Sequence, residues 1–519
     1  MGSRRFADTA LPPSLPASKD NGGGRTGHHP LSDVDGTGAG SRSRTVDHQK
    51  GSPMRRALLV LLTVLLPSVL ITGTAHAGPS AAAAPTVAVV PANAGRGWPV
   101  SGAQGVLDLA ARGYVEEEYL LSGQADTFDQ VGLWTDDGRW ATRVATTGTP
   151  YTTRMVVVRP RDAARFNGTV VVEWLNVSFG VDIPVDFSQS YEHFIREGYA
   201  YVGVTTQKAG ADKLKSLDPA RYGAVNLGGD ALSYDVFSQA AQAVRANPQV
   251  LGGRTPTIVL GTGHSQSALR LTTYANAIQP VRRSYDGFMI HGRAALAAPI
   301  GDGVVGPLSA RIRTDLGVPV FVLQSETDVI ASASVRQDTA QVRTWEVAGT
   351  AHADQYGLNL YNAANARDRS INDGAPTTCD KPVNSMTFRY AENAAFRYLD
   401  RWARGGAAPP TAAPIAMLLN LVILRDGDQN ALGGVRLPDL DVPVASYSPN
   451  NSGGNVPGAC LLLGTTTPLT PDRIRQLYPD HTTYVAKFTA AADRALRAGY
   501  LLPPDRDEAV ARAQAAPVP

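Results

Sequence analysis

The pattern of hydrophobic and polar positions changes sharply along the chain. Up to residue 53 Gly, Ser, Arg and Asp dominate and apolar residues are almost absent, so residues 1–53 are expected to be disordered. From Gly168 onwards, short β-branched runs alternate with segments whose apolar residues recur every three or four positions. This alternation predicts an α/β fold with a mostly parallel central sheet and helices on both faces.

The same pattern predicts the individual elements. Strands are expected over 169–173, 200–205, 257–260, 287–290, 318–323 and 344–347, and helices over 188–197, 235–246, the segment after Ser265, 333–341 and 391–404. Upstream, residues 114–121 and 151–158 predict two strands that form an antiparallel N-terminal part of the sheet. Downstream, Thr470 is placed to cap a helix over 471–477, and another helix is expected around 484–498.

An apolar run near the start of the chain indicates export. Residues 54–77 combine two arginines, an apolar stretch over 57–71 and an Ala-His-Ala end, as is typical of a secretory signal peptide. The stretch is shorter than the about 20 apolar residues that a spanning helix needs, so a permanent membrane anchor is the less favoured alternative. We expect a secreted protein that has no membrane attachment after cleavage. Translation is then expected to begin at Met54, with residues 1–53 arising from a misplaced start.

The remaining boundaries follow from composition. Residues 78–97 are rich in Ala, Pro and Gly and predict a linker. Residues 98–500 are expected to form one catalytic domain, and residues 501–519 a loose tail.

Composition and charge narrow the range of partners. The chain has 519 residues, of which 43% are hydrophobic, and a net charge of +2. The expected domain contains no basic block and no aromatic ladder among basic residues, so nothing indicates a nucleic-acid partner. The two cysteines, Cys379 and Cys460, lack C-x-x-C spacing, which disfavours a zinc or thioredoxin-like site. Two free thiols or one disulfide remain open, and export favours the disulfide.

A serine stands where the pattern changes from strand to helix. The pentapeptide Gly263-His264-Ser265-Gln266-Ser267 follows a β-branched run and precedes apolar residues at helical spacing. In a nucleophile elbow, a serine is held on such a strained turn with its oxygen above the sheet. Ser267 stands where glycine is usual, although serine is also small. An ordinary strand-to-helix turn is the alternative interpretation.

A serine nucleophile needs a base and an acid that orients the base. In α/β-hydrolases these follow in the chain order serine, acid, histidine. His352, just past the last core strand, is the predicted base, with His481 in reserve. Two carboxylates follow the strand over 318–323, and the spacing favours Asp328 over Glu326.

Other residues are expected to complete the site. The backbone N–H of Gln266 is a predicted donor to the oxyanion, and Leu175 or Asn176 is predicted to supply the second donor. Asn176 fits a plain turn equally well. His264 and His291 are possible pocket residues, and no metal or cofactor is expected.

Seven segments resemble a known family. They are GYVEEEYLLSG from Gly113, VVEWLNVS from Val171, GYAYVGVTTQ from Gly198, GHSQSA from Gly263, QSETD from Gln324, VAGTAHAD from Val347 and GGVRLP from Gly433. Together they resemble the bacterial alpha/beta hydrolase domain-containing proteins. The resemblance implies an alpha/beta-hydrolase fold, a serine hydrolase triad of Ser265, Asp328 and His352, and a GGVRLP segment within the same domain. It does not imply a substrate.

The expected function is therefore a secreted, metal-independent serine hydrolase, specifically a carboxylic ester hydrolase that forms an acyl-enzyme on a small-molecule ester. An amidase or peptidase with the same triad is one alternative. A non-catalytic binding protein on a hydrolase scaffold is another. Acyl and alcohol preference and oligomeric state have no signal in the sequence.

Overall fold

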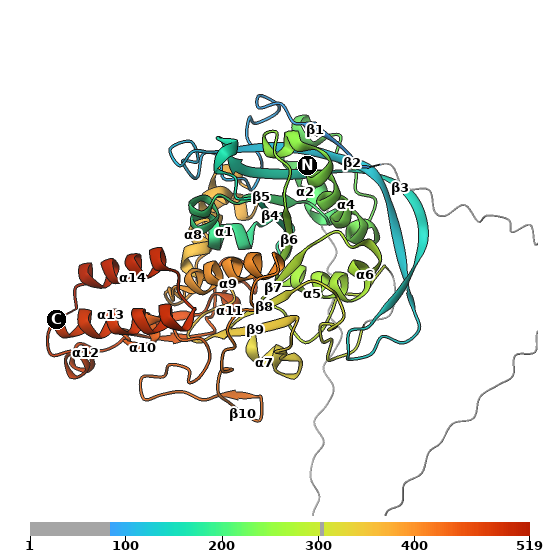
Figure 1. Cartoon of the computed structure of the whole chain (residues 1–519). Helices are drawn as coiled ribbons and strands as arrows, with labels where there is room; N and C mark the ends of the chain where they lie inside the picture. Colours follow the sequence, from blue (N-terminus) through green and yellow to red (C-terminus); the bar gives the residue numbers. More distant parts are fainter. Residues whose placement is uncertain (1–83, 302–305, 519) are drawn as a thin grey trace, which may run out of the picture. The chain divides into compact units, whose positions relative to one another are not determined.

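A computed structural model describes residues 84–301 and 306–518. The predicted extension, signal peptide and first part of the linker lie outside the described residues. At the centre is a nine-stranded sheet in the order β1-β2-β3-β5-β4-β6-β7-β8-β9 (Figure 1). Its strands are β1 Thr86–Val89, β2 Tyr114–Val131, β3 Ala141–Pro160, β4 Thr169–Trp174, β5 Ala200–Val204, β6 Ile258–His264, β7 Gly287–His291, β8 Val320–Ser325 and β9 Val342–Val347.

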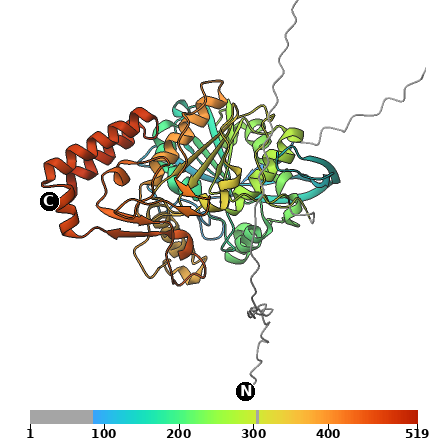
Figure 2. The same cartoon turned by 90° about the horizontal axis from the view of Figure 1, so that it is seen from below.

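The six strands β4 to β9 run parallel to one another, and β1, β2 and β3 are antiparallel to their neighbours. The predicted fold class is therefore confirmed, including the antiparallel N-terminal part. Strands β2 and β3 extend well beyond their predicted lengths, with 18 and 20 residues. Their far ends form a curved hairpin at the opposite end of the molecule from the C-terminal helices (Figure 2).

Helices cover both faces of the sheet because its strands are apolar on both sides. On β4, Val170 and Val172 pack into one hydrophobic cluster and Val171 into the other. The first cluster is shared with α2 Lys208–Leu217, α4 Ser233–Ala246 and α5 Gln266–Thr273, and the second with α1 Val185–Glu197 and α9 Phe388–Ala403. Figure 1 shows these two helical layers flanking the sheet. Shorter or peripheral helices are α3 Pro219–Tyr222, α6 Gln279–Arg282, α7 Val329–Ser332 and α8 Gln355–Asp368.

The C-terminal part of the chain packs on the same side as α1 and α9. Its elements are the strands β12 Ala445–Ser448 and β13 Thr465–Pro468, and the helices α10 Pro438–Asp441, α11 Cys460–Leu463, α12 Pro471–Leu477, α13 His481–Ala498 and α14 Pro503–Ala515. The predicted cap of α12 is confirmed, since the Thr470 side chain accepts a hydrogen bond from the N–H of Arg473.

Two terminal predictions were wrong. Within the expected linker, Thr86–Val89 form strand β1, because the exposed edge of β2 offers backbone groups with which they pair in antiparallel register. Within the expected loose tail, Pro503–Ala515 form helix α14. Its buried Asp505 lies 3.0 Å from Arg196 of α1 and anchors the helix to the body of the fold.

The predicted helix over 333–341 was also wrong. The chain forms only a 3₁₀ turn over Ala333–Val335 and then becomes extended. The side chain of Gln337 accepts a hydrogen bond from the N–H of Ile312 at 2.7 Å and donates one to its carbonyl at 2.9 Å. Arg336 pairs with Glu346 of β9. These tertiary contacts outweigh the local helical pattern.

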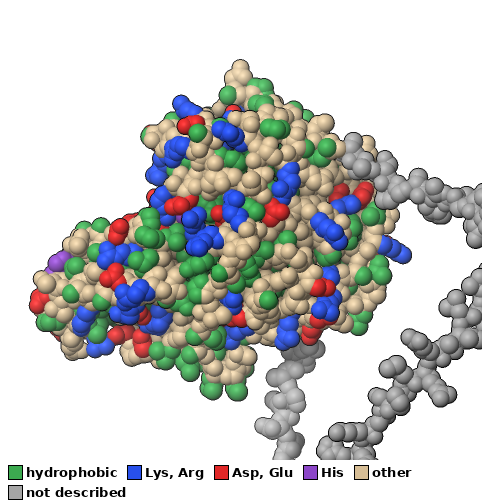
Figure 3. Space-filling view, in the orientation of Figure 1, with side chains coloured by type: hydrophobic (Ala, Val, Ile, Leu, Met, Phe, Trp, Pro, Cys, Tyr) green, Lys and Arg blue, Asp and Glu red, His purple; other side chains and the backbone are tan. Residues whose placement is uncertain are grey.

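A small hairpin projects apolar side chains. Strands β10 Met417–Leu418 and β11 Val422–Ile423 are joined by a turn whose Leu419 is 82% exposed. Figure 3 shows hydrophobic side chains along the lower edge of the face, where Figure 1 places β10. None of the helices in the described part of the chain has both the length and the apolarity that a bilayer span requires.

Cys379 and Cys460 form a disulfide, with their Cα atoms 5.7 Å apart. It joins α11 to the loop that follows α8. The sequence left open either two free thiols or one disulfide, and the structure has the disulfide.

The disulfide should contribute measurably to stability because it closes a loop between residues 81 positions apart. We expect the Cys379→Ser/Cys460→Ser variant to lose about 2–4 kcal/mol of unfolding free energy, measured by chemical denaturation. A reductant should lower the wild-type Tm toward that of the variant and leave the variant unchanged. An equal effect of the reductant on both proteins would contradict this.

Candidate active site

Ser265 occupies the turn between β6 and α5 in a strained conformation. Its φ is 61° and its ψ is −117°, a region that residues with a Cβ rarely adopt. The sheet holds it there, since the Ser265 N–H donates to the carbonyl of His291 on β7 at 2.9 Å. This is the geometry expected of a nucleophile elbow.

Small residues allow the strand and helix to approach closely at this turn. A Cβ on Gly263 would lie 3.1 Å from the Cβ of Ser267. The departure from glycine at Ser267 is accommodated because its hydroxyl donates to the carbonyl of Leu175 at 3.3 Å. The close packing thus depends on Gly263, while Ser267 fits with a hydrogen bond.

His352 and Asp328 form a buried pair. The Nδ1 atom of His352 lies 2.6 Å from Oδ1 of Asp328, and Oδ2 of Asp328 accepts bonds from the N–H and hydroxyl of Ser325. Since a carboxylate accepts, Nδ1 carries the proton and Nε2 has the lone pair in the neutral ring. Nε2 is buried and finds no partner within the described residues.

Asp328 is held in its charged form. Burial by itself would raise the pKa of this carboxyl, but the charge and hydrogen bond of His352 and the hydrogen bond from Ser325 outweigh it and lower the pKa. Asp328 is therefore a carboxylate at neutral pH, able to orient His352 and to stabilise its positive charge.

The structure gives Glu326 a different environment. Its carboxylate accepts the N–H of Gly349 at 2.7 Å and pairs with Arg425 at 2.5 Å. Burial raises the pKa of Glu326 and Arg425 partly opposes this. Of the two carboxylates, the structure brings only Asp328 to His352.

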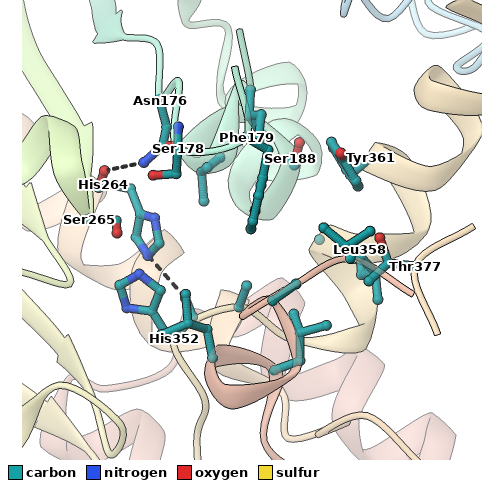
Figure 4. Close-up of a pocket in the computed structure, with 18 of the residues that line it drawn as sticks. Asn176, Ser178, Phe179, Ser188, His264, Ser265, His352, Leu358, Tyr361 and Thr377 are labelled. Carbon is teal, nitrogen blue, oxygen red and sulfur yellow. Dashed lines mark hydrogen bonds between the residues drawn. The ribbon is translucent and has the colours of Figure 1, made fainter. Parts of the chain in front are cut away.

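Ser265 and His352 line one cavity of about 100 Å³ (Figure 4). No hydrogen bond joins them, since Nε2 of His352 is unpartnered. Most of the lining is apolar. The lining residues are Asn176, Ser178, Phe179, Ile183, Val185, Ser188, Gln189, His264, Ser265, His352, Ala353, Gly357, Leu358, Tyr361, Thr377, Val456, Ala459, Leu462 and Leu463.

The three other histidines weighed from the sequence are placed differently. His264 lines the cavity, and its Nε2–H donates to the carbonyl of His352 at 2.9 Å. Burial and the neighbouring His352 and His291 hold the pKa of His264 well below its usual range, so the ring is neutral. His291 does not line the cavity, and its Nδ1 lies 2.7 Å from Asp186. His481 lies at the start of α13, where it contacts the carbonyls of Gln514 and Val518.

The predicted second oxyanion donor is not available at either position. The N–H of Leu175 donates to Val204 at 3.3 Å and that of Asn176 to Ile183 at 3.2 Å. The Asn176 side chain accepts the N–H of Ser178 and donates to the carbonyl of His264, so it acts as a turn former. In this loop the N–H of Val177 has no acceptor among the described residues. Gln266 begins α5, where its N–H has no intrahelical partner.

Sequence reasoning missed one wall of the cavity. This wall comes from the disulfide-linked segments, more than 110 positions beyond Ser265, and consists of Thr377, Val456, Ala459, Leu462 and Leu463. The only sequence signal near them is the cysteine pair itself.

The family comparison agrees with the observed fold. The model of a family described as an alpha/beta hydrolase domain matches residues 76–511. Similar solved structures include an a/b serine hydrolase without lid from Xanthomonas campestris, with 13% identity, 48% of this chain and 97% of that chain covered, and a TM-score of 0.25. A structure of an esterase from Rhizomucor miehei is 11% identical, with 58% of this chain and 92% of the esterase covered and a TM-score of 0.30. A structure of an alpha-beta serine hydrolase homologue from Coxiella burnetii is 10% identical, with 43% of this chain and 92% of the homologue covered and a TM-score of 0.28. No curated protein matches the chain.

The strain at Ser265 can be measured by substitution. Ser265→Gly should have an unfolding free energy about 1 kcal/mol above that of Ser265→Ala, because only glycine adopts this φ without a Cβ penalty. At Ser267, which lies within helix α5, the alanine variant should instead be more stable than the glycine variant, by about 1 kcal/mol. The unfolding free energies of the four variants are to be measured by chemical denaturation. If Ser265→Ala proved as stable as Ser265→Gly, the turn would not be strained.

Proposed function

The chain belongs to the alpha/beta hydrolase domain family, and we propose that within it this protein is a serine hydrolase that cleaves carboxylic esters of small molecules. One observation carries the proposal. Ser265 and His352 face the same cavity, and Asp328 holds the far side of the His352 ring at 2.6 Å. These are the positions that a nucleophile, its base and the orienting acid need.

In the proposed mechanism, Ser265 Oγ attacks the ester carbonyl and His352 Nε2 takes its proton. Nε2 is suited to this because it carries the lone pair and has no competing partner in the described structure. Asp328 stabilises the resulting imidazolium. His352 then returns the proton to the leaving alcohol, and water releases the acyl group by the reverse sequence.

Two backbone groups are proposed to stabilise the oxyanion. Gln266 directs a free N–H from the start of α5, where the helix dipole also favours negative charge. The second N–H is proposed to come from the same loop as Leu175 and Asn176, whose N–H groups are occupied. Those of Val177 and Phe179 have no acceptor among the described residues, and of these two residues Phe179 lines the cavity. Such donors typically contribute about 100- to 1,000-fold each to the rate.

The cavity supports a small substrate with an apolar part. Phe179, Ile183, Leu358 and Leu463 are among its lining residues, and no Asp, Glu, Lys or Arg is. An apolar acyl or alcohol group could bury its surface there.

Export is part of the proposal. The signal-peptide pattern over 54–77 supports it, and so does the disulfide, which persists in oxidising compartments.

Covalent labelling tests the nucleophile. A fluorophosphonate probe should label the wild-type protein at Ser265, located by peptide mass spectrometry, because this reagent needs an activated serine. The Ser265→Ala variant should not be labelled, and Ser267→Ala should be labelled like the wild type.

Absence of label on folded wild-type protein would favour a non-catalytic binding protein. Turnover of matched p-nitrophenyl esters and p-nitroanilides then separates an esterase from an amidase, and faster anilide cleavage would overturn the ester assignment.

Two isosteric variants test the acid. Asp328→Asn should lower kcat/KM for a p-nitrophenyl ester by about 10,000-fold, because the His352 ring loses its orienting carboxylate. Glu326→Gln should lower it by less than about tenfold, since Glu326 contacts Arg425 and Gly349 rather than His352. Circular dichroism controls for folding of both variants. A larger loss in the Glu326 variant would reverse the assignment.

A further inference from the structure

A group of polar side chains is buried where α1, α9 and the end of β7 meet. Asp186 and Ser190 lie one turn apart on α1, His291 ends β7, and Glu392 lies on α9. All four are at most 1% exposed. None of them lines the cavity of Ser265.

Several atoms of this group lack hydrogen bonds. Both carboxylate oxygens of Glu392 and Nε2 of His291 have no hydrogen bond of good geometry in the described part of the chain, and the Ser190 hydroxyl approaches only Glu392. A buried polar group without a partner costs about 1–3 kcal/mol, and more when it is charged. Several unpartnered polar atoms at one buried position indicate that a bound partner is missing.

The group also carries more acid than base. Asp186 is paired with Nδ1 of His291 at 2.7 Å, and it accepts a bond from Thr262 at 2.5 Å. Neither Glu392 nor the adjacent Glu173 forms an ion pair with a Lys or Arg among the described residues. Bound protons or a bound cation must therefore balance these carboxylates.

We propose that Asp186, His291 and Glu392 bind a divalent metal ion, with Ser190 as a fourth ligand. One ligand atom from each of the first three lies within 4.8 Å of the others. One imidazole nitrogen with carboxylate and hydroxyl oxygens suits Zn²⁺ or Mn²⁺.

The ion would have a structural role. It would join two helices and a strand beneath the elbow, and His291 is the residue whose carbonyl accepts the N–H of Ser265. No step of the proposed ester hydrolysis passes through it, so the two proposals stand or fall separately.

Metal analysis of the full chain tests the proposal. Protein purified without chelator, and then incubated with Zn²⁺ or Mn²⁺ and desalted, should contain about one ion per chain by inductively coupled plasma mass spectrometry. A strong chelator should lower its Tm by about 5 °C and the ion should restore it. Glu392→Gln should hold less than about one-tenth of the wild-type metal, and its Tm should not respond to chelator. Glu192→Gln, an α1 variant whose carboxylate pairs with Arg389 of α9 and is not a proposed ligand, should bind metal as the wild type does.

Two results would overturn the proposal. One is wild-type protein that retains less than about one-tenth of an ion per chain and shows no chelator effect. The other is a Glu392→Gln variant as stable as the wild type, which would assign protons to the group because glutamine mimics a neutral acid. If Glu392→Gln does not fold, the wild-type metal content decides alone.

Discussion

The backbone conformation of Ser265 is the constraint on which the site depends. A φ of 61° with a Cβ present is tolerated only because β6 is paired on both sides and α5 begins immediately afterwards. The same turn places the Ser265 hydroxyl at the carboxyl ends of the parallel strands. The loops after β8 and β9 end at that edge too, which is why Asp328 and His352 meet there.

Local patterns were sufficient to predict the parallel part of the sheet. Strands buried on both faces are continuously apolar, and β4 and β5 have the β-branched composition that marks them. The elbow was predictable for a related reason, since the change of period at Ser265 is a local property. Asp328 was favoured over Glu326 by spacing alone, and the structure places it against His352.

What could not be predicted depends on distant partners. Strand β1 exists because β2 offers an edge, and α14 because α1 and α9 offer a surface. The second oxyanion donor was misjudged in the same way. Whether an N–H is free depends on which carbonyl lies opposite, and for Leu175 and Asn176 those carbonyls belong to Val204 and Ile183.

The separation of Glu326 from Asp328 shows how the C-terminal segment takes part in the site. Glu326 pairs with Arg425, which lies just beyond β11, and not with His352. That segment is held against the sheet edge, where Val435 donates to the carbonyl of Glu346 at 2.7 Å and accepts the N–H of Ala348 at 3.0 Å. Without it Glu326 would be a buried, unpaired carboxylate two residues from Asp328. The segment from Arg425 to Val435 therefore supplies the counter-ion of a buried carboxylate next to the site, and cannot be treated as an appendage of the fold.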